Sequence, residues 1–165
     1  MKISKIKLAL FAMATTFFAV GVTEFISVGV LPAVAHEFSI STSTAGLITT
    51  LYALGVAIGA PILTLLTNNL AKKKVILSAL LIFSLSHLLI AAAPNFLTVL
   101  IGRFIAGAAH GLLFALSSII AAALVGPSKQ AKAIDLFFQV LQLLLPWERH
   151  SELPLVPLSV GEFLF

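Results

Sequence analysis

Residues 96–125 read FLTVLIGRFIAGAAHGLLFALSSIIAAALV, and Arg103 is the only formally charged side chain in this run. A helix of about 20 apolar residues crosses the ~30 Å hydrocarbon core of a bilayer. Inside that core only helices and closed barrels satisfy all their backbone hydrogen bonds. Three further runs of the same kind cover residues 8–31, 45–66 and 75–93. The sequence therefore predicts an all-α integral membrane protein with four transmembrane helices.

The composition excludes several classes of protein. Of 165 residues, 60% are hydrophobic and 10% are charged, and the mean hydropathy is +1.15. A soluble domain carries about 25% charged and 45–50% apolar residues, so soluble and disordered proteins are both excluded. The chain has no Cys, which rules out disulfide scaffolds, thiolate metal sites and cysteine nucleophiles. We expect no metal, no cofactor and no enzymatic activity.

The basic residues indicate how the chain crosses the membrane. The pI of about 9.7 could suggest nucleic acid as a partner, but the lysines form short clusters beside the apolar runs, so we expect no such partner. Cytoplasmic loops of membrane proteins are rich in Lys and Arg. By this rule, we expect the N-terminus and the loop before residue 75 to lie in the cytoplasm. We expect the chain to cross the inner (plasma) membrane of the cell several times. The clusters are Lys2, Lys5 and Lys7, then Lys72, Lys73 and Lys74, then Lys129 and Lys132.

A cleaved signal peptide is a weak alternative for the first run. An apolar core of 7–15 residues is usual in such peptides. Residues 8–31 are longer than that, contain Glu24, and are followed by further spans. We expect Pro32 and the polar pair His36 and Glu37 to end this helix, and Ser41 to Thr44 to cap the next one.

Three polar residues inside the spans are candidates for a substrate or proton pathway. A charge near the bilayer centre costs about 2.5–3.5 kcal/mol on insertion scales and usually faces a cavity or a partner. Glu24 could bind a proton or an organic cation in exchange, or it could simply reach the outer interface. Arg103 could line a cavity or extend to the lipid headgroups. His110 lies seven residues after Arg103 on the same helical face, where it could carry protons or only pack.

Small residues in the second and fourth runs predict where helices pack closely. Gly55 and Gly59 are four residues apart, as are Gly107 and Gly111. This spacing lets two helix backbones approach within a membrane. Pro61, two residues beyond Gly59, could kink its helix. The pattern indicates packing and carries no chemistry.

Taken together, these residues resemble the N-terminal part of a major facilitator superfamily transporter, and more narrowly its drug:proton antiporter and sugar-efflux branch. The resemblance covers residues 1 to about 134 and implies the first four helices of a six-helix half. In that family the first and fourth helices line the central cavity, so Glu24 and Arg103 would face it, and the Arg-x-x-x-Gly signature is linked to proton coupling. The matching segments are residues 23–25, 29–32, 41–46, 51–55, 59–61 and 103–107.

The loop between the second and third helices departs from the family's Gly-x-Leu-Ala-Asp-Arg-x-Gly-Arg-Lys motif. Thr64 stands at the first Gly, Asn68 at the Asp, Asn69 at the Arg and Ala71 at the second Gly. The basic end is kept by Lys72, Lys73 and Lys74. The resemblance implies a gating loop here, and the loss of the Asp puts its charge-relay role in question.

The function expected from the resemblance is proton-coupled efflux of a small molecule by a parent transporter, with the bilayer, the substrate and the proton as partners. This chain would be inactive alone, or would take the missing helices from another chain. One rival is an independent four-helix exporter acting as a dimer, as in the small multidrug resistance family. Another is a non-transporting membrane adaptor or inhibitor.

The segment 135–165 departs from the family, and we expect an irregular or partly helical tail without a domain. About twelve mostly apolar residues from Asp135 are too few to span a bilayer, and Pro146, Pro154 and Pro157 interrupt the remainder of the segment. With plausible codons, a neighbouring frame reads SIFSGFTVASSLGTPFGT from Asp135 and FGWRVSF over residues 159–165. Both resemble the family's fifth helix and the loop after it, which suggests a frameshift near Ile134.

The frameshift hypothesis predicts the DNA sequence around the codon for Ile134. Moving to the neighbouring frame there should restore the fifth-helix sequence and continue through further spans. Sequencing the gene measures this directly, and an uninterrupted frame with unrelated codons would contradict it.

Overall fold

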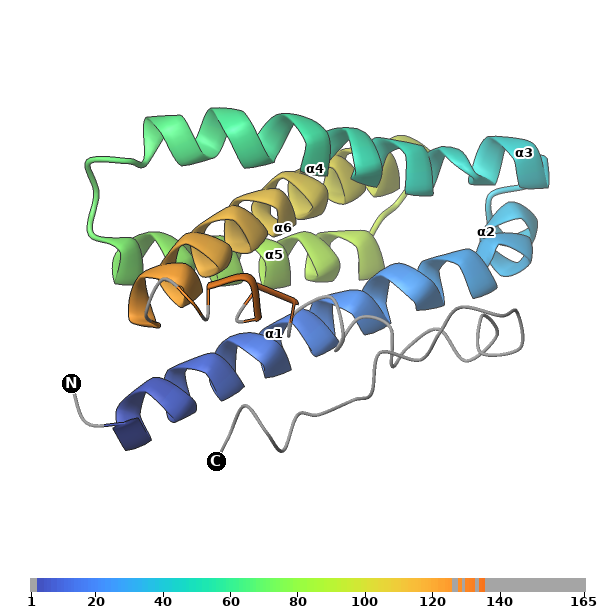
Figure 1. Cartoon of the computed structure of the whole chain (residues 1–165). Coiled ribbons are helices and arrows are strands. Elements are labelled where there is room, and N and C mark those ends of the chain that lie inside the picture. The colour runs from blue at the N-terminus through green and yellow to red at the C-terminus, as the bar shows by residue number, and fades with distance from the viewer. Residues whose placement is uncertain (1–2, 126–127, 129, 133, 136–165) are drawn as a thin grey trace, which may run out of the picture. The chain divides into compact units, whose positions relative to one another are not determined.

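The computed structural model describes residues 3–125, 128, 130–132 and 134–135, and this part of the chain is built from α-helices (Figure 1). The all-α class predicted from the sequence is thereby confirmed. Apart from Asp135, the tail expected over 135–165 lies outside the described residues. The helices are α1 (Ile3–Gly29), α2 (Leu31–Glu37), α3 (Thr42–Ala45), α4 (Leu47–Leu66), α5 (Lys72–Ala91) and α6 (Phe96–Leu124).

Within the described part of the chain, four helical segments are long and apolar enough to cross a membrane. They cover Leu8–Gly29, Thr42–Leu66, Lys72–Ala91 and Phe96–Leu124. Their mean hydropathies lie between 1.7 and 2.1. Many large apolar side chains along them are exposed, including Leu65 at 76% and Leu88 at 65%. A surface of this kind suits lipid rather than water.

The chain divides into two compact units, and α1 and α6 contribute to both. One unit comprises residues 1–23 and 118–165, and the other comprises residues 24–117. In the first, α1 carries a buried stripe on one face, while Leu8, Phe11 and Phe18 are exposed. The stripe consists of Leu10, Ala14, Phe17 and Val20, at the spacing of one helical face.

In the unit of residues 24–117, α6 lies between α4 and α5. Val75 and Ala79 of α5 form a buried cluster with Leu112, Leu113 and Leu116 of α6. Leu63 from α4 packs against the same cluster. The burial of α6 agrees with this central position. Half of the most apolar stretch of its span is buried, whereas 22% is buried in the spans that contain α4 and α5.

The contact between α4 and α6 is made backbone against backbone. A Cβ added at Gly55 would overlap the carbonyl oxygen of Phe104, and one added at Gly107 would overlap that of Tyr52. A Cβ at Gly59 would lie 2.5 Å from Ala108 Cα. A Cβ added at Gly111 would lie 2.6 Å from the carbonyl oxygen of Val56 in α4. Only glycine permits this close approach. The glycine contact therefore determines which residues of α4 lie opposite which residues of α6.

The structure differs from the sequence-based expectation at the end of the first span. The helix ends at Gly29, and Pro32 does not terminate it but lies in the first turn of α2, which also contains His36 and Glu37. Proline is well suited to a first helical turn, because its missing N–H would have no intrahelical partner there.

Two further boundaries also differ. Ser41 does act as a cap, since its side chain accepts a hydrogen bond from Thr44 N, but it caps the short α3 before α4 begins at Leu47. The lysines expected in the loop instead form the first turn of α5, which starts at Lys72. Pro61 lies inside α4.

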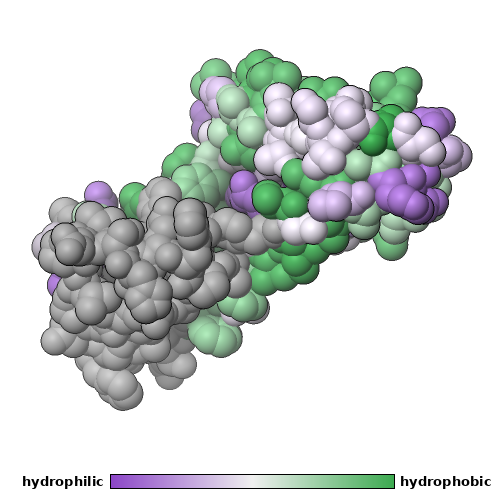
Figure 2. All heavy atoms as spheres, turned by 90° about the vertical axis from the view of Figure 1, so that its right-hand side faces the viewer, coloured by the Kyte–Doolittle hydropathy of each residue, from purple (hydrophilic) through white to green (hydrophobic). Residues whose placement is uncertain are grey.

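The connection from α2 to α3 forms a polar end of this unit. Ser39 has φ of 52°, Ser39 N donates to His36 O and Ile40 N donates to Ala35 O at 2.9 Å. These are the bonds of a Schellman motif, with serine where glycine is usual. The Phe38 and Phe96 rings pack 5.8 Å apart beside it. Figure 2, which faces this end, shows hydrophilic side chains gathered there and hydrophobic ones on the flanks.

The close contact of α4 and α6 gives a stability prediction. Gly107→Ala should lower the free energy of unfolding by roughly 1–3 kcal/mol, the usual cost of overpacking a core. Gly29→Ala is the matched control, because nothing lies within 4 Å of a Cβ added at Gly29. Detergent-exchange unfolding followed by circular dichroism measures both, and equal effects would contradict the close contact.

Candidate functional site

Arg103 is the charge that lies deepest in the packed helices of the described region. It stands seven residues after the start of α6, about 10 Å along the helix. Only 3% of its surface is exposed. The alternative that its side chain extends to the headgroups does not fit this burial. Burying a cation is costly unless its N–H groups find acceptors.

Two groups from α4 shield the Arg103 guanidinium. Its Nε donates a hydrogen bond to the carbonyl oxygen of Ile48 at 3.2 Å. Its Cζ lies 4.2 Å from the centre of the Tyr52 ring, in a cation–π contact. Nη2 is buried and has no hydrogen-bond acceptor among the described residues. The guanidinium is therefore held in place, with both N–H groups of Nη2 left to donate to another group.

Tyr52 also holds His110. The Tyr52 hydroxyl and His110 Nδ1 are 2.8 Å apart, and either group can donate in this hydrogen bond. A neutral imidazole can accept from the hydroxyl, while a protonated one donates to it. The bond therefore persists whether or not His110 carries a proton. Tyr52 itself is only 1% exposed, so its ring and hydroxyl are fixed by packing.

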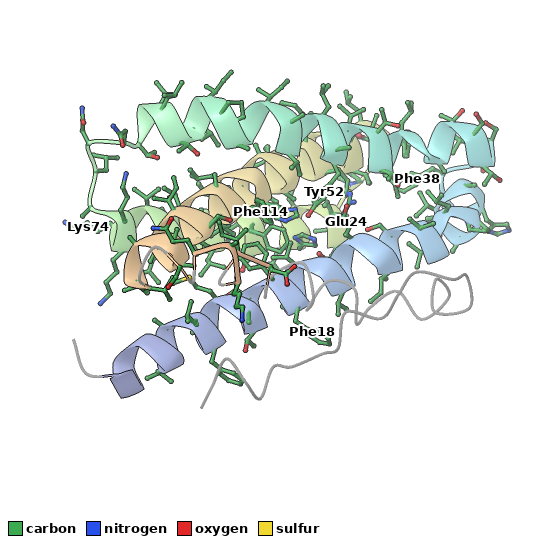
Figure 3. All side chains as sticks on the ribbon, in the orientation of Figure 1. Phe18, Glu24, Phe38, Tyr52, Lys74 and Phe114 are labelled. Carbon is green, nitrogen blue, oxygen red and sulfur yellow. The ribbon has the colours of Figure 1, made fainter. Side chains whose placement is uncertain are left out.

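Glu24 is an acidic residue that interacts with Arg103 and Tyr52 through its charge. It is partly buried in α1. In the described part of the chain, Glu24 and Arg103 do not form a direct ion pair, so they interact over a longer distance. Figure 3 labels Glu24 on α1 and Tyr52 on α4. Glu24 lies near the end of α1, whereas Tyr52 and Arg103 lie near the starts of α4 and α6.

We define the Arg103 cluster as Glu24, Ile48, Tyr52, Arg103 and His110. It joins a carboxylate, a shielded cation with an unused donor, and a tyrosine–histidine pair within apolar helices. Such a set can bind a polar group of a small molecule and exchange a proton with it. The three residues expected from the sequence, Glu24, Arg103 and His110, all belong to it.

Tyr52 and Ile48 were not among the candidate residues. Tyr52 is the only tyrosine in the chain, and it lies three residues before Gly55, the glycine that brings α4 against α6. A lone tyrosine in an apolar run beside a close-packing glycine is a signal that could have identified it. The role of Ile48 depends on its backbone carbonyl, which no side-chain pattern indicates.

The residues expected to form a gating loop are placed apart from the cluster. Asn68 lies in the α4–α5 connection, and Lys72, Lys73 and Lys74 lie in the first turn of α5. Lys72 Nζ donates to Asn68 O at 2.9 Å and approaches Asn68 Oδ1 at 3.4 Å. The amide at position 68 thus accepts from a lysine at the end of its own connection.

Comparison with known proteins places the chain in a family. The family model described as Major Facilitator Superfamily matches residues 13–142. The uncharacterized MFS-type transporter YtbD of Bacillus subtilis is 44% identical over 130 residues, which cover 79% of this chain and 33% of that protein. The inner membrane transport protein YdhP of Escherichia coli is 37% identical over 139 residues, covering 84% and 36%.

A third relative is a chloramphenicol resistance protein of Streptomyces lividans, 30% identical over 127 residues, which cover 77% of this chain and 32% of that protein. The chain therefore spans about a third of the length of the curated relatives it matches. No solved structure shows a significant match.

The hydrogen bond between Tyr52 and His110 gives a coupling prediction. In a double-mutant cycle, Tyr52→Phe and His110→Leu should be coupled by about 0.5–1.5 kcal/mol, the net worth of one hydrogen bond. His87→Leu is the matched control, because His87 bonds within α5, to Phe83 O at 2.9 Å. Unfolding free energies measure the cycle, and additivity with His110→Leu would show that the bond is not formed.

Proposed function

Because the chain belongs to the major facilitator superfamily of membrane transporters, we propose that it forms the N-terminal four-helix part of a proton-coupled exporter of small molecules. The proposal assigns proton and substrate exchange to the Arg103 cluster. It also places the N-terminus and the α4–α5 connection in the cytoplasm, as the lysine clusters indicate.

The observation that carries this proposal is the buried, incompletely bonded guanidinium of Arg103. A cation in an apolar span carries a large free-energy cost of insertion, and such a residue usually has a function. Here it is 3% exposed, its Nη2 has no acceptor among the described residues, and a carboxylate interacts with it electrostatically. A substrate group could accept from Nη2 while Glu24 is protonated, and Glu24 could take over when the proton leaves.

The substrate class is supported by the chemistry of the cluster. It offers one cation donor, one acid and one tyrosine–histidine pair among apolar neighbours. These groups suit a small amphipathic molecule with carbonyl or hydroxyl oxygens, of the size of a drug or a sugar. The similarity to a chloramphenicol resistance protein supports a drug-like substrate.

Export by alternating access needs two halves that rock about a midplane site. The chain matches about a third of its relatives' length, so we propose that it does not transport alone and that the remaining helices complete the pathway. Those helices would supply the partner groups that the Arg103 cluster does not find within residues 24–117.

A chimaera tests the proposed role of Glu24. Residues 1–134 would replace the matching segment of the Streptomyces lividans protein, and chloramphenicol resistance would be measured in a sensitive host. We expect resistance from the chimaera and a fall to the empty-vector level for Glu24→Gln, because an uncharged amide cannot exchange a proton.

Glu37→Gln is the matched control, since Glu37 is an exposed acid of α2 and its loss should leave resistance within about twofold if charge there has no role. Equal loss in both variants, at equal membrane abundance, would sink the assignment of Glu24. Separately, the purified chain in liposomes should show no drug flux driven by a pH gradient.

A further inference from the structure

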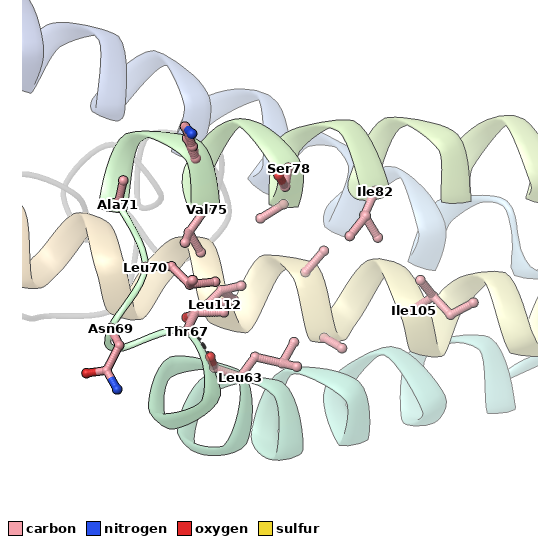
Figure 4. A pocket seen from close by; sticks show the side chains of 14 residues that line it. Leu63, Thr67, Asn69, Leu70, Ala71, Val75, Ser78, Ile82, Ile105 and Leu112 are labelled. Carbon is pink, nitrogen blue, oxygen red and sulfur yellow. Dashed lines mark hydrogen bonds between the residues drawn. The ribbon is translucent and has the colours of Figure 1, made fainter.

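A groove distinct from the Arg103 cluster runs between α4 and α5, with α6 as its floor. Its volume is about 580 Å³, and none of the five cluster residues lines it. Figure 4 shows it extending from Asn69, at the α4–α5 connection, to Ile82 and Ile105 at the opposite end. Ala71 and Ile82 both line it, and eleven residues of helix correspond to about 16 Å.

The walls of the groove are apolar. Leu63 of α4, Val75 of α5 and Leu112 of α6 line it toward the Asn69 end, and Ile82 and Ile105 line the opposite end (Figure 4). Ser78 is a small polar side chain on the α5 wall and is exposed. An elongated, apolar groove of this size accepts a flexible hydrocarbon chain more readily than a compact polar molecule.

One end of the groove is positively charged. Lys74 is the only charged residue among the described residues that line it. Whereas Lys72 Nζ donates to Asn68, the Lys74 ammonium group has no hydrogen-bond or ion-pair partner among the described residues, and the backbone N–H of Lys74 is bonded to Ala71 O. The sequence from residue 38 to residue 134 contains no Asp or Glu, so nothing acidic in this stretch neutralises that charge.

The start of α5 adds to the positive potential. The helix begins at Lys72, and its N-cap residue, Ala71, provides no side-chain cap for the first N–H groups. Uncapped N–H groups at a helix start attract anions. Lys72 is also the first residue of the candidate span Lys72–Ala91. The charged end of the groove therefore lies at the polar boundary of the span, and the apolar walls lie within the span.

We propose that this groove binds one anionic phospholipid of the surrounding bilayer. An acyl chain would lie along the apolar walls, and the phosphate would contact Lys74 and the first turn of α5. The bilayer is the source because the groove opens among helices that expose large apolar side chains to it. The proposal is independent of transport and of the Arg103 cluster.

Native mass spectrometry of the full chain, released from detergent and titrated with phosphatidylglycerol or phosphatidylcholine, tests this. We expect one saturable phosphatidylglycerol site with weaker phosphatidylcholine binding. Lys74→Gln should weaken phosphatidylglycerol binding about fivefold, the worth of one basic residue near an anionic lipid. Lys73→Gln should weaken it less than twofold, because Lys73 does not line the groove.

A second pair of variants tests the groove itself. Ser78→Leu fills the α5 wall without changing charge and should abolish the saturable site. Ser84→Leu, at an exposed position of α5 outside the groove, should leave it unchanged. The proposal is overturned by equal effects of the two lysine variants, by equal binding of the two lipids, or by an unaltered site in Ser78→Leu. Displacement of the lipid by oleate, or a Ser78→Leu-sensitive dimer of the chain, would also overturn it.

Discussion

The burial of Arg103 within apolar helices is the constraint on which the rest of this region depends. A guanidinium in such surroundings needs acceptors and a polarisable face close by. The Ile48 carbonyl and the Tyr52 ring supply them from α4. They reach Arg103 only because Gly55 and Gly107 bring the two backbones together. The packing of α4 on α6 and the placement of the charge are therefore one arrangement.

Much of this arrangement could be predicted from sequence patterns. The sequence predicts the four spans and the all-α class, because the length of an apolar run can be read directly from it. It also singles out Glu24, Arg103 and His110, because they are isolated polar residues within apolar runs. The position of Tyr52 beside Gly55 could have drawn attention to it, but its contacts with Arg103 and His110 depend on which face of α4 meets α6, which the sequence does not show. The entry of Pro32 into a helix of its own was also missed, because proline can end one helix or begin the next with equal ease.

The two charged regions of the unit serve different chemistries. The Arg103 cluster combines both signs of charge within the helices, where each group limits the freedom of the others. The lysines at the start of α5 carry one sign only, and position 68, which precedes them, holds the neutral residue Asn. Lys72 is bound to this neutral side-chain amide, so Asn68 does not neutralise the positive charge of the three lysines.

The glycine contact has a mechanical consequence. Where two helices meet through side chains, rotamer changes let one slide over the other. Here the glycines leave no room for even a Cβ between the two backbones, so α4 and α6 have no side chains at this contact whose rotamer changes would let them slide. Tyr52 and Arg103 therefore keep their places relative to each other in any rearrangement of this unit that leaves the glycine contact intact.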